Sequence, residues 1–112
     1  MDLLKTESYI NGKWVKGAKN FPVFNPFDGK KIADVAEMGG KETADAIECA
    51  HKAFASWKKM SPWKRGELLK KWDVLMHENW DALAKILTLE QGKPFEQSTH
   101  ELMGNTGFFN WH

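Results

Sequence analysis

A chain of 112 residues, of which 42% are hydrophobic, has the length and composition of one folded domain and not of a disordered tail. Its 16 basic and 15 acidic side chains leave a net charge of +1, so the chain lacks the strong positive field that attracts nucleic acids or anionic membranes. We therefore expect neither nucleic acid nor a membrane as a partner.

The cysteine content and the first residues indicate the cellular compartment in which the protein is expected. The one cysteine, Cys49, leaves no internal disulfide and suits a reducing compartment. Residues 1–5 carry neither the apolar core of a secretory signal nor an arginine-rich amphipathic pattern, and no later stretch has the apolar length that spans a bilayer. We expect a soluble, cytoplasmic protein.

The first structured stretch is a predicted β-hairpin around Asn11-Gly12. Two apolar pairs, Tyr9-Ile10 and Trp14-Val15, flank this dipeptide. Asparagine and glycine accept the positive φ angles of a two-residue turn, which makes this the strongest hairpin signal in the sequence.

A second hairpin is predicted around Asp28-Gly29. Its strands are expected over 21–24 and 31–35. Pro26 holds the residue before it in an extended conformation, and the Asp-Gly pair supplies the turn. Two linked hairpins therefore open the chain.

Four amphipathic helices are predicted after Met38-Gly39-Gly40 ends the extended pattern. In the first, apolar residues recur every three or four positions, at Ala44, Ile47, Ala50, Phe54 and Trp57. The expected helix bounds are 42–59, 62–77, 80–91 and 95–111. The chain thus divides into a β-hairpin region, residues 1–37, and a helical region, residues 38–112.

Capping signals mark the helix ends. Ser61-Pro62 is an N-cap followed by proline at the first helical position, and Asn79 is the predicted N-cap of the third helix, with Asp81 in its first turn. Gly92 can take the left-handed conformation that closes a helix, and Pro94 has the fixed φ that opens the next. Only a short break at Glu78-Asn79 should separate the second and third helices.

No catalytic or cofactor-binding residue emerges from the spacing. Cys49 and His51 are two residues apart on a helix and point away from each other, which favours a structural thiol over a nucleophile. The four histidines have no metal-ligand spacing, and no glycine-rich nucleotide motif follows a strand. Trp57 and Trp72 lie on apolar stripes and are expected in the core, with a stacking surface as the alternative.

The last residues form an aromatic cluster, residues 108–111, where a finished domain would show a cap, a glycine or a polar tail. Such large rings need a partner surface. We therefore expect the chain to be a piece of a larger fold, truncated within its last helix.

Three motifs, taken in order, point to a known family: Tyr9–Trp14 (YINGKW), Phe24–Gly29 (FNPFDG) and Leu87–Pro94 (LTLEQGKP). The chain resembles the N-terminal segment of the aldehyde dehydrogenase superfamily from Tyr9 onward. The EQGKP form of the third motif is most similar to the succinate-semialdehyde dehydrogenase branch. The resemblance implies an α+β fragment, two N-terminal β-hairpins followed by four helices, of an α/β aldehyde-dehydrogenase-like fold.

The resemblance also implies oxidoreductase chemistry for a full-length relative. In this family a cysteine attacks the aldehyde, NAD or NADP takes the hydride, and a glutamate activates water. Those groups, and the residues that hold the cofactor, lie beyond His112, and Cys49 does not match the motif of the nucleophile. We expect no catalytic residue, no cofactor-binding residue, no bound cofactor and no activity in this chain.

The resemblance also implies a cation site and a partner for the chain. Some family members hold a monovalent cation, and the matching ligands here are the carbonyl oxygens of Val23 and Phe24 and the carboxylate of Glu90. The alternative for Glu90 is a cap or an ion pair with a lysine. The family is homo-oligomeric, so the expected partner is the rest of the fold or a second copy.

A different class of protein is the alternative for the whole chain. It would be a stand-alone or split-gene interaction module without catalysis, whose aromatic face docks on a partner. A reading frame that continues past His112 favours the fragment over this module.

Overall fold

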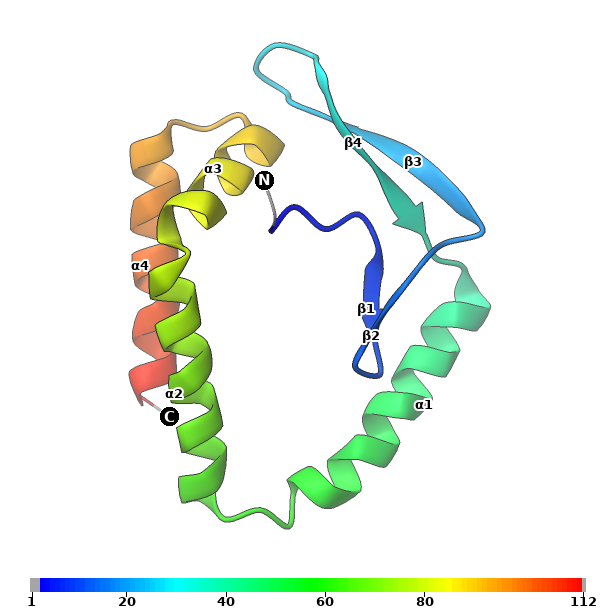
Figure 1. Ribbon diagram of the computed structural model, residues 1–112, viewed down its shortest axis with the longest axis vertical. Coiled ribbons are helices and arrows are strands. Elements are labelled where there is room, and N and C mark those ends of the chain that lie inside the picture. Colours follow the sequence, from blue (N-terminus) through cyan, green and yellow to red (C-terminus); the bar gives the residue numbers. More distant parts are fainter. Residues whose placement is uncertain (1–2, 112) are drawn as a thin grey trace.

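The computed structural model describes the backbone of residues 3–111 and the side chains of residues 3–104. Two β-hairpins precede four helices (Figure 1): β1 (Ser8–Ile10), β2 (Lys13–Val15), β3 (Lys19–Phe24), β4 (Lys31–Glu37), α1 (Gly40–Trp57), α2 (Pro62–Glu78), α3 (Trp80–Gln91) and α4 (Phe95–Trp111). This order confirms the predicted fold class, and every helix begins and ends within two residues of its predicted bounds.

The first hairpin forms as predicted. Asn11 and Gly12 have φ angles of 51° and 76°, the two positive values that a tight turn between twisted strands requires. Tyr9 lies opposite Trp14 in the antiparallel pair, with ring centroids 5.1 Å apart. The Lys5 ammonium lies 5.9 Å from the centroid of Trp14, a cation–π contact that ties the preceding segment to the hairpin.

The second hairpin is longer than predicted and carries a bulge. Val23 pairs with Ala33 and Phe24 with Lys31, so Ile32 has no partner on β3 and the register shifts there. The turn is closed by the side chain of Asn25, whose Oδ1 accepts a hydrogen bond of 2.9 Å from the amide of Phe27.

Helix α1 begins two residues before its predicted start because of its cap. The carboxylate of Glu42 accepts a hydrogen bond of 3.1 Å from the amide of Gly39, which satisfies one orphan donor and lets the helix begin at Gly40. Helix α2 begins as predicted, with Ser61 Oγ accepting from the amide of Lys64 and Pro62 in the first helical position.

Asn79 is the N-cap residue of α3, as predicted, but its side chain bonds to α2. Its Nδ2 donates a hydrogen bond of 2.8 Å to the carbonyl oxygen of Leu75, so the side chain caps the end of α2, and no side-chain cap bond serves α3 in the described chain. The reason is the short junction: Asn79 alone separates the helices, and its φ of −111° and ψ of 17° turn the side chain back toward α2.

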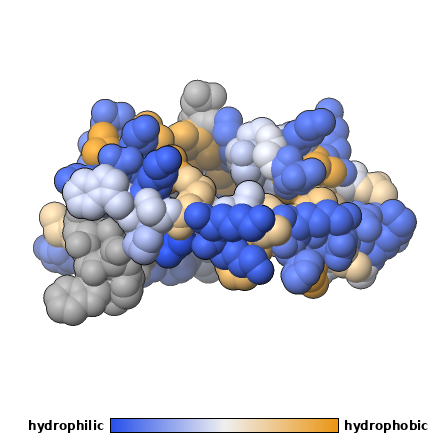
Figure 2. Space-filling model, turned by 90° about the horizontal axis from the view of Figure 1, so that it is seen from below, coloured by the Kyte–Doolittle hydropathy of each residue, from blue (hydrophilic) through white to orange (hydrophobic). Residues whose placement is uncertain are grey.

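Helices α2, α3 and α4 pack together, whereas α1 and the first hairpin lie on the other side of an opening, and the turn of the second hairpin reaches the end of α3 (Figure 1). The molecule is thin, with a shortest extent of 19 Å, close to two helix diameters. Figure 2 looks along the longest axis from below, at the end of the molecule, where hydrophilic residues predominate. Such a layer encloses little interior, and in the described chain the fully buried side chains are Ala84 and Ser98. None of the described helices has the length and apolar character to cross a membrane.

Two tryptophans predicted in the core are exposed. Trp57 is 38% exposed and Trp72 is 53% exposed, so the prediction was wrong for this chain. Trp57 lies at the end of α1, on which no other helix packs closely, and one thin layer cannot cover both sides of α2. The predicted aromatic cluster at 108–111 lies outside the described side chains.

Candidate functional site

A close contact joins the β3–β4 turn to the α3–α4 junction. Gly92 closes α3 with a φ of 66°, and its amide donates to the carbonyl oxygen of Thr88 at 2.8 Å, as predicted for a left-handed cap. A Cβ at this position would lie 2.8 Å from Cγ of Pro26 and 3.2 Å from the amide nitrogen of Phe27. Only glycine allows the turn to approach this closely.

This contact brings together the regions that hold the three predicted cation ligands. Val23 and Phe24 end β3 at the bulge, just before the turn, and Glu90 lies in the last turn of α3, two residues before Gly92. Val23 and Phe24 both keep partners on β4, and the extra residue of the bulge is Ile32 on β4. A hollow of about 280 Å³ lies at the contact, lined by Asn25, Phe27, Thr88, Gly92, Lys93 and Pro94.

Two side-chain pairs hold the α3–α4 junction. Thr88 Oγ1 and Ser98 Oγ are 2.8 Å apart, and Ser98 is fully buried. The ammonium of Lys93 is mostly buried and pairs with the carboxylate of Glu101 on α4. Sequence reasoning missed both pairs. The available signal was a serine and a threonine on helix faces that otherwise carry apolar residues.

The carboxylate of Glu90 is exposed, and the lysine near it is paired with another carboxylate. Lys93 is taken by Glu101, and within the part of the chain whose side chains are described no lysine or arginine forms an ion pair with Glu90. On the hairpin side, the hydrogen bond from the Lys30 ammonium lowers the pKa of Asp28 below its ordinary value, so this carboxyl stays ionised. Asp28 and Glu101 are each paired with a lysine, so the exposed carboxylate of Glu90 is the charge that favours a cation over an anion here.

The remaining chemistry-bearing residues do not form a site. Cys49 lies on α1 beside a second hollow of about 340 Å³, which the first hairpin covers. His77 Nδ1 lies 2.9 Å from the carbonyl oxygen of Asp73 and 3.5 Å from Asp73 Oδ1, which is buried without a hydrogen bond. Among the described residues, no three His, Cys, Asp or Glu side chains lie close enough to hold a metal ion. A cation at the junction would therefore depend on backbone carbonyls.

Comparison with known proteins assigns the chain to a protein family. The model of the aldehyde dehydrogenase family matches residues 14–112. The chain belongs to this family. Mitochondrial succinate-semialdehyde dehydrogenase of Rattus norvegicus is 41% identical over 110 residues, which are 98% of this chain and 21% of the rat enzyme. The 3-sulfolactaldehyde dehydrogenase of Pseudomonas putida is 40% identical over 111 residues, which are 97% of this chain and 23% of that enzyme.

Solved structures agree with the family assignment. The crystal structure of an NADP-dependent enzyme from E. coli superposes with a TM-score of 0.94 at 35% identity, over 98% of this chain and 23% of that enzyme. The chain thus spans about a fifth of the length of the aldehyde dehydrogenases it matches, and it corresponds to their N-terminal segment. The rat relative is mitochondrial, so a cytoplasmic location stays a prediction.

Proposed function

We propose that this chain is the N-terminal scaffold segment of an NAD(P)-dependent aldehyde dehydrogenase, with succinate semialdehyde as the first candidate substrate. One observation carries the proposal: the rat succinate-semialdehyde dehydrogenase matches 98% of this chain, whereas the match takes up only 21% of that enzyme. The segment would hold its part of the fold in place, while the rest of the fold performs the chemistry. Its partner would be that remaining part, or a second copy of the chain.

The residues of this chain do not fit a nicotinamide cofactor, which supplies hydride transfer in the complete enzyme. Cofactor phosphates bind where a strand leads into a helix and the backbone amides are free. In the described chain, β4 leads into α1, and there the amide of Gly39 already donates to the carboxylate of Glu42. A carboxylate at that helix end repels phosphate. We derive no step through the cofactor from these residues.

Purified 112-residue chain is expected to give no turnover of succinate semialdehyde with either NAD⁺ or NADP⁺. Catalysis of this type needs a nucleophile, a base, an oxyanion donor and an oriented cofactor together. The assay follows absorbance of the reduced cofactor at 340 nm, with the rat enzyme as positive control and a sizing column to establish the oligomeric state. Turnover by a clean, monomeric sample would overturn the proposal.

We also propose that the carbonyl oxygens of Val23 and Phe24 and the carboxylate of Glu90 share a monovalent cation. Hard cations prefer oxygen ligands of this kind. Two observations support the site: the close approach of the turn to Gly92, and the lack of an ion pair to Glu90 among described side chains.

Substituting Glu90→Gln is expected to abolish stabilisation by sodium or potassium. A bound ion stabilises the folded chain in proportion to ln(1 + [L]/Kd), so the midpoint of thermal unfolding should rise with NaCl or KCl above its value in choline chloride of equal ionic strength. Glu96→Gln, which changes another exposed glutamate, serves as the control and should keep this rise. Equal responses of the unmodified chain to all three salts would exclude the site.

A further inference from the structure

Helix α1 carries a wider apolar surface than the first hairpin covers. Its small side chains line the hollow of about 340 Å³ against the hairpin: Ala46, Cys49, Ala50 and Ala53. Its large side chains are exposed: Ile47 by 65%, Phe54 by 54% and Trp57 by 38%. These three, spaced by seven and three residues, lie on one side of the helix and are called the α1 stripe below.

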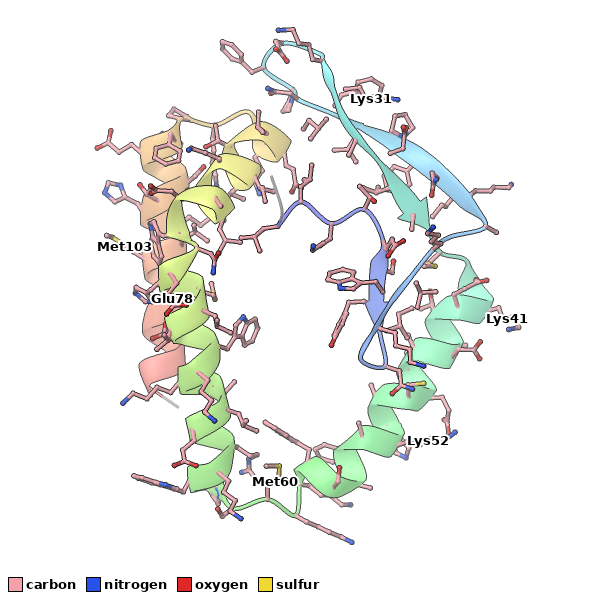
Figure 3. The ribbon with its side chains drawn as sticks, in the orientation of Figure 1. Lys31, Lys41, Lys52, Met60, Glu78 and Met103 are labelled. Atoms are coloured by element: carbon pink, nitrogen blue, oxygen red, sulfur yellow. The ribbon has the colours of Figure 1, made fainter. Side chains whose placement is uncertain are left out.

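The α1 stripe lies opposite the charged side of the helix. Lys41 and Lys52, three helical turns apart, lie on the side of α1 that is turned away from the opening (Figure 3). Phe54 is two residues from Lys52 and Ile47 is five residues from it, spacings that place them on opposite sides of a helix. The stripe therefore belongs to the side that looks toward the opening between α1 and α2. No residue of α1 is buried in the described chain.

The placement of α1 is that of a complete enzyme. The E. coli enzyme superposes with a TM-score of 0.94 over 98% of this chain, yet this match is only 23% of that enzyme. The same opening between α1 and the other helices is therefore present in an enzyme that contains much more polypeptide than this segment. Few contacts within the described chain hold α1 at this distance, so the missing polypeptide is the body against which it rests.

We propose that the α1 stripe is the surface on which the remaining four-fifths of the aldehyde dehydrogenase fold docks, and that the two parts associate through it even as separate polypeptides. This inference rests on the proposed function and names the contact surface of the scaffold. The occupant is the rest of the fold and not a second copy, because the superposing enzyme holds that additional polypeptide alongside the same arrangement of the segment.

The test pairs two adjacent substitutions. Phe54→Glu places a charge in the stripe, whereas Ala55→Glu places the same side chain on the neighbouring exposed position outside it. Both positions lie in the last turn of α1, so each new glutamate meets the same end of the helix dipole, and Ala55→Glu controls for that charge. Phe54→Glu also removes the contact of the Lys58 ammonium with the Phe54 ring. The partner is the rat succinate-semialdehyde dehydrogenase without its matched N-terminal segment, co-expressed with the chain so that the two fold together. Circular dichroism checks that each variant retains its helices.

The readout is the dissociation constant of the complex, with hydrogen exchange of α1 in the unmodified complex as a second measurement. We expect binding by the unmodified chain and by Ala55→Glu, and at least about 30-fold weaker binding by Phe54→Glu. Slower exchange across residues 47–57 is also expected in the complex of the unmodified chain. If Phe54→Glu does not fold, this exchange measurement alone tests the inference.

Equal binding by all three chains, or unprotected exchange across 47–57, overturns the inference and leaves the proposed function intact. Failure of the unmodified chain to bind also overturns the inference and leaves the proposed function intact, since a segment of one continuous polypeptide need not reassemble as a separate chain. Phe54-dependent self-association without binding of the rat polypeptide assigns the stripe to a second copy and overturns the inference.

Discussion

Replacing Gly92 with alanine is expected to lower the free energy of unfolding by about 2 to 5 kcal/mol. Two independent costs add at this position. The φ of 66° is left-handed, which costs an L-residue about 1 to 2 kcal/mol. The added Cβ also meets Cγ of Pro26 at 2.8 Å, and crowding of this kind costs about 1 to 3 kcal/mol. The turn must then move away from the junction, and the hollow there must open.

Gly29→Ala separates these two costs. Gly29 has a φ of 70°, nearly that of Gly92, but no atom lies within 4 Å of the Cβ it would gain. It should therefore lose only the backbone part, about 1 to 2 kcal/mol. Urea unfolding followed by circular dichroism gives both values, and hydrogen exchange at the amide of Phe27 reports whether the turn has moved. Equal losses for the two variants would show that the contact between Pro26 and Gly92 has no energetic weight.

Replacing Ser98 with leucine is expected to cost about 2 to 5 kcal/mol. Ser98 is fully buried between α3 and α4, so three additional carbon atoms must push the helices apart. The substitution also removes the partner of the half-buried Thr88 hydroxyl, 2.8 Å away, and the loss of such a hydrogen bond costs about 0.5 to 1.5 kcal/mol. Both effects act on the junction that closes the hollow.

Gln97→Leu is the matched control for Ser98→Leu. Gln97 is the preceding residue of α4 and is exposed, so the same leucine should change stability by no more than about 0.5 kcal/mol. Thermal unfolding of both variants measures the difference. Ser98→Ala should fall between them, since it removes the hydroxyl without crowding. A loss of similar size for Gln97→Leu would show that burial at position 98 does not account for the effect.

Local signals were enough to predict the elements of this chain. The Asn11-Gly12 turn and the caps at Ser61 and Gly92 depend on the backbone preferences of a few neighbouring residues, and each lies where it was predicted. The signal at Asn79 was real, but its meaning was ambiguous. An asparagine between two helices can serve either end, and the backbone angles at the junction decided for α2.

The amino-acid sequence by itself determined the hairpins, the helices and membership of the aldehyde dehydrogenase family. Only the tertiary structure decided that Pro26 meets Gly92, that Ser98 is buried, and that the large residues of the α1 stripe are exposed. The physical reason is the separation along the sequence between the residues that interact. Turns and caps involve residues within about four positions of each other, whereas Pro26 and Gly92 meet only after two hairpins and three helices have taken their directions. An apolar stripe likewise predicts that a side of a helix will be covered, but it does not say which polypeptide covers it.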